Sequence, residues 1–179
     1  TTYDGVGNVI SVTDSDENTT TFSYDARNRL IAEENVNGAI RSHTYDAVGN
    51  RTSVTDRNNR VREFSYDAMN RQIEENWLDE EDNSIHTITS IYDAIGQLID
   101  VSDPDSKYRF KYDVFGGRTS VDNTGTPGVP RVVLDYKYDA EGNIISVTDT
   151  INGQAEGVTD YTYDAFNRTT QITQKGNGV

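Results

Sequence analysis

The sequence has no cysteine and only two histidines, His43 and His86. Without cysteine there is no disulfide framework, no thiolate zinc site and no thiol nucleophile. Two histidines leave little material for a zinc site or a Ser-His-Asp arrangement. No apolar run approaches the length of a membrane-spanning helix. These absences predict a chain that is not an enzyme, has no cofactor and does not span a membrane.

Apolar and basic side chains are also scarce. Leu, Ile, Val and Phe together account for 38 of the 179 residues, and the formal net charge is -14. This composition lies close to that of disordered proteins, so only regular patterning allows a packed fold. A chain with a pI near 4.4 is repelled by phosphate backbones and by anionic membranes. We therefore expect no nucleic-acid partner.

The regular pattern is a repeat of the dipeptide Tyr-Asp. Eight of the eleven tyrosines lie in it, and successive copies are 21, 21, 21, 26, 20, 26 and 25 residues apart. The copies begin at Tyr3, Tyr24, Tyr45, Tyr66, Tyr92, Tyr112, Tyr138 and Tyr163. A period near 21 indicates an array of supersecondary units, each too small to bury its own apolar face.

Each Tyr-Asp pair predicts a tight turn. The fourth residue after the Tyr is always Gly or Asn, the two residues that most readily adopt positive φ. Asp followed by two unrestricted residues and then Gly or Asn fits a type I turn closed by a left-handed residue, with the Asp carboxylate accepting turn N–H groups. The predicted structural turn residues are Asp4, Gly7, Asp25, Asn28, Asp46, Gly49, Asp67, Asn70, Asp93, Gly96, Asp113, Gly116, Asp139, Gly142, Asp164 and Asn167.

The segments between turns alternate with a period of two, which predicts half-buried antiparallel strands. Aromatic and branched aliphatic residues would lie on one face, and Ser, Thr and charged residues on the other. About sixteen strands in eight hairpins are expected. The predicted core ladder is Ile10, Val12, Phe22, Tyr24, Val54, Phe64, Tyr66, Ile99, Val101, Phe110, Tyr112, Val121, Tyr136, Tyr138, Ile145, Val147, Tyr161 and Tyr163.

The connections between hairpins carry all the length variation. They contain segments such as "DEEDNSIH", "NTGTPGVP" and "TINGQAEG", and Asn37-Gly38 and Asn152-Gly153 are hairpin-turn dipeptides. One rim of the sheet would therefore have uniform turns and the other variable loops. Turns reading Gly-Asn also tend to alternate with turns reading Asn-Arg, which suggests a larger unit of about 42 residues.

The motif "YDxxGN", a "TD" about seven residues later and the next aromatic-x-Tyr-Asp resemble the YD-repeat (Rhs) family along the whole chain. That family includes secreted bacterial toxins, shell subunits of insecticidal toxin complexes and teneurin-type surface proteins. The resemblance implies a spiral antiparallel β-sheet that forms a hollow shell, in toxins around a C-terminal effector. It also implies an extracellular or cell-surface location. No residues here match the family's C-terminal boundary motif, self-cleaving protease segment or effector domains.

Other candidate sites are few. The acidic loops around Asp14 and Asp16 and around Asp79 and Asp82 cluster oxygen ligands that suit calcium, although neither follows the EF-hand pattern. Trp77 fits either the apolar end of a strand, which we favour, or a sugar-stacking platform. His43 occupies a strand position held elsewhere by Phe22, and His86 falls in a variable loop.

These observations predict an all-β array of eight hairpin units over residues 1–179, forming a continuous curved antiparallel sheet. The chain begins inside a repeat, at Thr1-Thr2-Tyr3-Asp4, so we expect it to be a segment of a longer protein. The expected function is a non-catalytic wall of a shell, tube or fibre. Its partners would be further repeats of the same polypeptide, other copies joined end to end, or an enclosed effector. The alternative is a module that binds glycans or proteins through its variable rim.

Overall fold

The computed structural model describes residues 1–176, which contain strands and turns but no helix. No helix that could cross a membrane is therefore found in this part of the chain. The strands are β1 Thr2–Tyr3, β2 Val9–Thr13, β3 Thr19–Tyr24, β4 Leu30–Glu34, β5 Ile40–Tyr45, β6 Arg51–Thr55, β7 Val61–Tyr66, β8 Gln72–Leu78, β9 Ser84–Tyr92, β10 Leu98–Ser102, β11 Lys107–Tyr112, β12 Arg118–Asp122, β13 Val132–Tyr138, β14 Ile144–Ile151, β15 Gln154–Tyr163 and β16 Thr169–Gly176.

The sixteen strands form one sheet in sequence order, each beside its neighbour in the chain. The registers are antiparallel throughout, for example from β1 with β2 to β15 with β16. The Tyr-Asp pairs lie at the ends of odd-numbered strands, so each marks the turn of one hairpin. The predicted all-β fold of sixteen strands in eight hairpins is confirmed. Only β1 and β16 have a single neighbour in this order.

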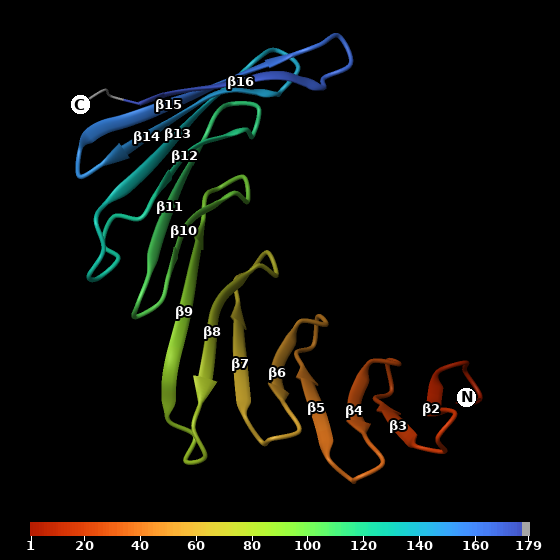
Figure 1. Cartoon of the computed structure of the whole chain (residues 1–179). Helices are drawn as coiled ribbons and strands as arrows, with labels where there is room; N and C mark the ends of the chain where they lie inside the picture. Colours follow the sequence, from red (N-terminus) through yellow and green to blue (C-terminus); the bar gives the residue numbers. More distant parts are fainter. Residues whose placement is uncertain (177–179) are drawn as a thin grey trace. The chain divides into compact units, whose positions relative to one another are not determined.

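The chain forms two compact units, residues Thr1–Ile88 and the part that follows from Thr89. The boundary lies inside β9. In each unit the Tyr-Asp turns follow one another along one rim of the strands, because consecutive antiparallel strands reverse direction at every turn (Figure 1). We call this the Tyr-Asp rim, and we call the other ends of the hairpins the opposite rim.

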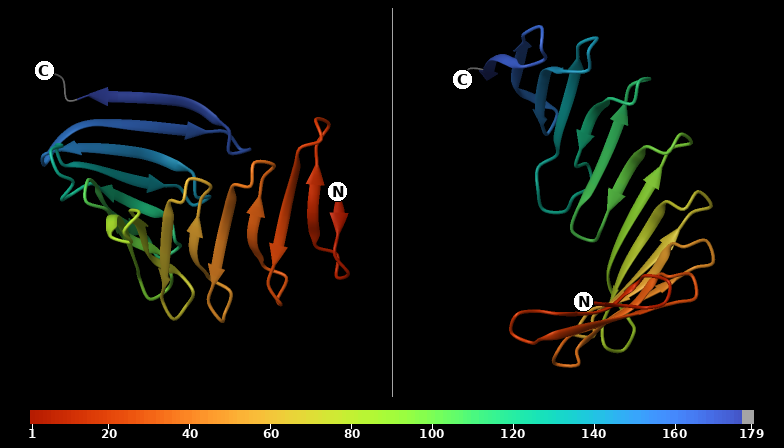
Figure 2. Two further views of the ribbon diagram at one scale, coloured as in Figure 1. Left: turned by 90° about the horizontal axis from the view of Figure 1, so that it is seen from below. Right: turned by 90° about the vertical axis from the view of Figure 1, so that its right-hand side faces the viewer.

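Each unit is a single layer of strands, as the views in Figures 1 and 2 show. A single layer has no second sheet or helix to cover its faces, so little side-chain surface is buried. Among the described residues, only Val54 and Phe64 are buried apolar side chains. Of the other residues in the predicted core ladder, Ile10, Val12 and Ile145 are exposed, and the rest are half-buried. The observed core is therefore much thinner than the predicted one.

The predicted separation of apolar and charged faces is wrong in the first unit. Glu33 is the cross-strand partner of Phe22, and it forms ion pairs with Arg41 and Arg57 on the face that carries the aromatic side chains. Arg62 and Glu75 form a further ion pair at 3.3 Å on that face. A half-solvated face can hold such pairs because their charged ends remain in water.

Candidate functional site

The eight Tyr-Asp turns share one backbone geometry. Each connects its strands through five residues, and the N–H of the Asp donates to the carbonyl of the last of them over 2.8–3.0 Å. The fourth residue after every Tyr has positive φ, from 60° at Asn28 to 110° at Gly49. The pairing register shifts at these turns, as at Tyr24 and Tyr45, which is the signature of a bulge next to a left-handed residue.

The Asp carboxylate closes each turn from within. Its Oδ1 accepts the N–H groups of the second and fourth residues after the Asp in all eight copies. In the third turn Oδ1 of Asp46 also accepts the N–H of Gly49, at 2.7 Å. These bonds satisfy backbone donors that the bulge would otherwise leave without a partner. The structure thus places all sixteen sequence-predicted turn residues in turns.

The other carboxylate oxygen usually binds the side chain of the fifth residue after the Tyr. Asn8 donates to Oδ2 of Asp4 at 2.8 Å, and Arg71 donates through Nε to Oδ2 of Asp67 at 2.7 Å. The hydrogen bond from the Asn8 side chain lowers the pKa of Asp4 below its ordinary value of 3.8. The hydrogen bond from the Arg71 side chain does the same to the pKa of Asp67. These carboxylates are therefore held in the ionised form by local donors.

The alternation of Gly-Asn and Asn-Arg turns has a structural cause. Asn8 also donates its side-chain N–H to Oδ1 of Asn28 on the next Tyr-Asp turn, at 3.0 Å. The same bond joins Asn50 to Asn70 at 2.9 Å and Asn143 to Asn167 at 3.1 Å. Each Gly-Asn turn is thus bonded to the asparagine of the Asn-Arg turn that follows it.

An arginine continues this chain of contacts from the second turn to the third. Arg29 donates to the carbonyl of Asp46 at 3.0 Å, and its guanidinium lies over the ring of Tyr45, 4.6 Å from the ring centre. Arg27 donates to the carbonyl of Ala47. Guanidinium groups suit this position because their several donors are fixed in one plane that can also stack on an aromatic ring.

Six of the repeated tyrosines tie their hairpin to the preceding one. The hydroxyl of Tyr24 donates to the carbonyl of Val9 at 2.9 Å, the first residue after the previous Tyr-Asp turn. Tyr45, Tyr66, Tyr112, Tyr138 and Tyr163 each make the equivalent bond at 2.7–2.9 Å. This role of the tyrosine hydroxyl was not predicted from the sequence. The signal was present, since phenylalanine would pack equally well but never replaces tyrosine at these eight positions.

The opposite rim is less variable than the sequence suggested. Its first four turns, which begin at Asp14, Asn35, Asp56 and Asp79, use the same five-residue geometry with a left-handed fourth residue. The second unit differs from the first. It has a four-residue connection at Asp103, a nine-residue loop from Asn123 and a two-residue turn at Asn152-Gly153, where both φ angles are positive.

Two sequence interpretations on this rim need correction. His86 lies in β9 and not in a loop, because the turn that begins at Asp79 already ends at Asn83. Most of "TINGQAEG" is also strand, since β14 and β15 are joined by two residues only. In both segments the polar composition suggested a loop, but polar residues are tolerated in a strand whose faces remain half-solvated.

Two of the four calcium candidates, Asp14 and Asp79, bind other groups through their carboxylates in this structure. Oδ1 of Asp14 accepts two turn N–H groups and Oδ2 accepts the side-chain amide of Asn18 at 3.1 Å. Asp79 accepts turn N–H groups in the same way. No cluster of three or more acidic or histidine side chains suited to a metal occurs within residues 1–176. Calcium binding stays a prediction for Asp14, Asp16, Asp79 and Asp82.

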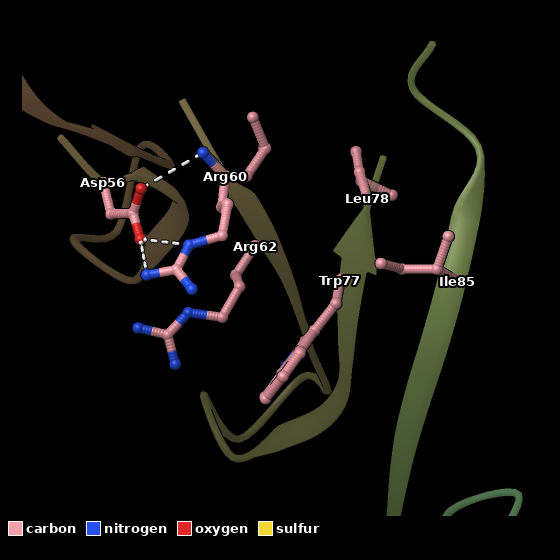
Figure 3. Close-up of a pocket in the computed structure, with 7 residues that line it drawn as sticks. Asp56, Arg60, Arg62, Trp77, Leu78 and Ile85 are labelled. Carbon is pink, nitrogen blue, oxygen red and sulfur yellow. Dashed lines mark hydrogen bonds and ion pairs between the residues drawn. The ribbon is translucent and has the colours of Figure 1, made fainter. Parts of the chain in front are cut away.

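Trp77 lies one residue before the end of β8 and forms part of a shallow groove of about 220 Å³ in the first unit. Val61, Leu78 and Ile85 supply the rest of its apolar lining. Arg60 and Arg62 lie on the other side of Trp77 from Ile85 (Figure 3). Arg60 is held by Asp56 at 2.6 Å. The indole N–H of Trp77 donates to Glu75 at 2.8 Å, and its ring lies 5.3 Å from that of His86.

His43 is half-buried in β5, where its cross-strand partner is the buried Val54. Its Nδ1 is buried and has no hydrogen-bond partner. Burial, followed by the charges of Arg51 and Arg41, lowers the pKa of His43 below 6.5. A neutral imidazole that packs against Val54 fits a strand packing residue.

Comparison with known proteins agrees with the repeat geometry. The profile of the RHS repeat matches residues 3–40, 45–76 and 138–179, which is more than half of the chain. The chain belongs to the RHS repeat family. Six of the eight Tyr-Asp turns lie within the matched residues. No curated protein matches the sequence.

Solved structures show the same fold. A crystal structure of TcdB2-TccC3-Cdc42 matches with a TM-score of 0.78 over 94% of this chain, at 18% identity. A mutant Tc holotoxin pore of Photorhabdus luminescens matches with a TM-score of 0.76 over 97% of the chain, also at 18% identity. This RHS repeat chain spans 10% of the length of either of those chains.

Proposed function

We propose that this RHS repeat chain is a non-catalytic segment of the wall of a secreted or cell-surface shell, tube or fibre. The observation that carries the proposal is that the repeated residues bind the backbone of the chain itself. Every Tyr-Asp carboxylate accepts N–H groups of its own turn, and the tyrosine hydroxyls bind the carbonyls of neighbouring hairpins. The most regular residues of the chain thus hold its own backbone.

The same observation supports the absence of catalysis. General acid–base and nucleophilic chemistry require one constellation of side chains with matched geometry and perturbed pKa values. Here the pKa shifts of Asp4, Asp67 and Asp139 are all downward, first because of a side-chain hydrogen bond from the residue four positions later. Such carboxylates remain ionised at neutral pH and cannot serve as general acids.

The proposal also concerns the longer polypeptide to which this chain would belong. Similar structures include TcdB2-TccC3 without its hypervariable C-terminal region, whose chain is about ten times as long as this one. We propose that this chain likewise belongs to a longer extracellular polypeptide, as one array of eight hairpin units among further repeats. Its enclosed partner would be an effector, and its outer contacts would be other repeats.

The test is to isolate the native polypeptide with an antibody raised against residues 1–179 and to determine its length by mass spectrometry. The proposal predicts a polypeptide with Tyr-Asp repeats on at least one side of this segment. It also predicts that limited proteolysis leaves an enclosed segment intact until the repeats are cut. A native chain of these eight repeats alone, in the form of a compact monomer, would contradict the proposal.

The Trp77 groove favours a second candidate, a module that binds glycans or proteins. An exposed indole beside Leu78 and Ile85 offers a flat apolar platform, and Arg60 and Arg62 offer donors. A glycan-array screen with the wild-type chain and with Trp77→Ala tests it. Binding that is lost in Trp77→Ala supports the module, whereas a chain that binds no glycan, or binds equally in both forms, speaks against it.

A further inference from the structure

The third residue after each repeated tyrosine is called here the tip of its Tyr-Asp turn. Most of these tips carry large apolar side chains. In the first unit, the third residues after the tyrosines are Val6, Arg27, Val48 and Met69, and the three apolar ones are 65–72% exposed. Turn positions of this kind usually hold Gly, Asn, Asp or Ser. Apolar residues gain nothing there by burial within the chain itself.

The second unit has the same feature. Its corresponding residues are Ile95, Phe115, Glu141 and Phe166, and the apolar ones are 79–95% exposed. Six of the eight tips are thus apolar and two are charged. The two charges are of opposite sign, with the arginine in the first unit and the glutamate in the second.

The opposite rim shows that the turn itself does not require apolar tips. The four turns of identical geometry on that rim carry Asp16, Asn37, Asn58 and Glu81 at the equivalent position. All four are polar, and each donates its N–H to the turn carboxylate or amide as the apolar tips do. The apolar tips therefore have a cause outside the turn, and an exposed row of apolar side chains marks a contact surface.

The order of the tips indicates what that surface contacts. Read from the N-terminus, the tips of the first unit are one apolar residue, Arg27 and then two apolar residues. Read from the C-terminus, the tips of the second unit are one apolar residue, Glu141 and then two apolar residues. Neighbouring tips are two strands apart, about 9.6 Å in any sheet of this kind, so the spacing of the two rows also agrees.

We propose that the Tyr-Asp rim is an interface between two copies of this chain. The first unit of one copy would face the second unit of the other, with the chains running in opposite directions. Arg27 of that first unit then meets Glu141 of that second unit, and every remaining tip meets an apolar tip. This contact leaves the unpaired sides of β1 and β16 uninvolved, so it differs from joining end to end.

The positions of the two charged groups are compatible with this contact. The guanidinium of Arg27 is held at the rim by its hydrogen bond to the carbonyl of Ala47 on the neighbouring turn. Glu141 is exposed, and its own N–H donates to Asp139, which fixes the tip backbone. With a net charge of -14 on each copy, unspecific association is disfavoured and a matched pair of opposite charges selects this register.

Sedimentation equilibrium of the 179-residue chain tests the proposal with a charge exchange. Arg27→Glu or Glu141→Arg alone places like charges opposite each other in this contact, and should weaken dimerisation roughly tenfold or more. The double variant Arg27→Glu with Glu141→Arg restores the opposite charges and should restore dimerisation. Glu80→Arg, on a turn of the opposite rim, is the control for added positive charge and should leave dimerisation unchanged.

Three results would overturn the proposal. They are a wild-type chain that stays monomeric at high concentration, an oligomer that both single variants leave intact, and a double variant that dimerises no better than the single ones. An intact oligomer would point to pairing through β1 and β16 instead. All substituted tips are exposed, so circular dichroism should show the wild-type fold in every variant.

Discussion

The connections on the two rims of the sheet differ in how uniform their lengths are, although the same type of five-residue turn occurs on both rims. On the Tyr-Asp rim all eight connections have five residues and the same hydrogen bonds. The opposite rim has four connections of this kind, all in the first unit, and three of four, nine and two residues in the second. The Asp-based turn alone therefore does not require uniform length.

The tyrosine explains the difference. The residues before the opposite-rim turns include Thr13, Thr55 and Ser102, none of which can reach across a hairpin to a distant carbonyl. On the Tyr-Asp rim, Tyr24 and Tyr45 reach the first residue after the preceding Tyr-Asp turn. A longer or shorter turn there would displace the carbonyl that the next tyrosine needs. The contact between hairpins thus requires a uniform turn length on the Tyr-Asp rim. A turn on the opposite rim only has to connect its own two strands.

The largest difference between the rims should appear on insertion. Adding Gly-Ser between Ala68 and Met69 interrupts a turn on the Tyr-Asp rim and should cost roughly 2–3 kcal/mol, the loss of two or three backbone hydrogen bonds. The same insertion between Pro127 and Gly128, in the nine-residue loop, should cost about 0.6 kcal/mol or less. Urea denaturation measures both values. Equal losses would show that the two rims constrain the chain to the same degree.

A smaller loss is expected from strain within one turn. Gly142 has φ of 87°, and Gly142→Val places a β-branched residue in the left-handed region at a cost of about 1–2 kcal/mol. Gly142→Asn is the matched control, because Asn28, Asn70 and Asn167 occupy this position in other turns. The melting temperature should fall for Val and barely change for Asn. An unchanged melting temperature for Val would contradict the turn geometry.

The sequence predicts these turns well because a turn is local. Asp and Gly or Asn at a fixed spacing determine the backbone, and the left-handed positions at Gly49, Gly116 and Gly142 follow from them. The core was predicted poorly, because alternation shows which face a residue lies on but not whether anything covers that face. Ile10 and Val12 have the pattern of core residues and are exposed on a single layer. The bridges made by tyrosine hydroxyls depend on register between distant repeats, which local pattern does not reveal.

The smallest effect concerns pH. The pKa of Asp67 is lowered from 3.8, first by the Arg71 side chain, and that of Asp4 first by the Asn8 side chain. A lowered pKa in the folded state stabilises the fold fully above the unfolded value and loses this effect as pH falls through the folded value. These carboxylates should leave the melting temperature unchanged above about pH 5 and lower it below about pH 4, while the lowered pKa of His43 adds a separate fall as the pH drops below about 6.5. Asp67→Asn should make this acid dependence shallower, and an unchanged profile would contradict the role of that carboxylate.

The repeated Tyr-Asp pair is a structural bridge that recurs along the chain, and not a site used once. The most direct test is the free energy of unfolding of six single Tyr→Phe variants, at Tyr24, Tyr45, Tyr66, Tyr112, Tyr138 and Tyr163. Each should lose about 1 kcal/mol, the typical net contribution of one hydrogen bond. Tyr108→Phe, at an exposed strand tyrosine outside the pairs, is the control and should lose almost nothing. Similar losses at all six positions are the predicted result. No loss at any of them, or one position that accounts for nearly the whole effect, would contradict a repeated structural role for the tyrosines.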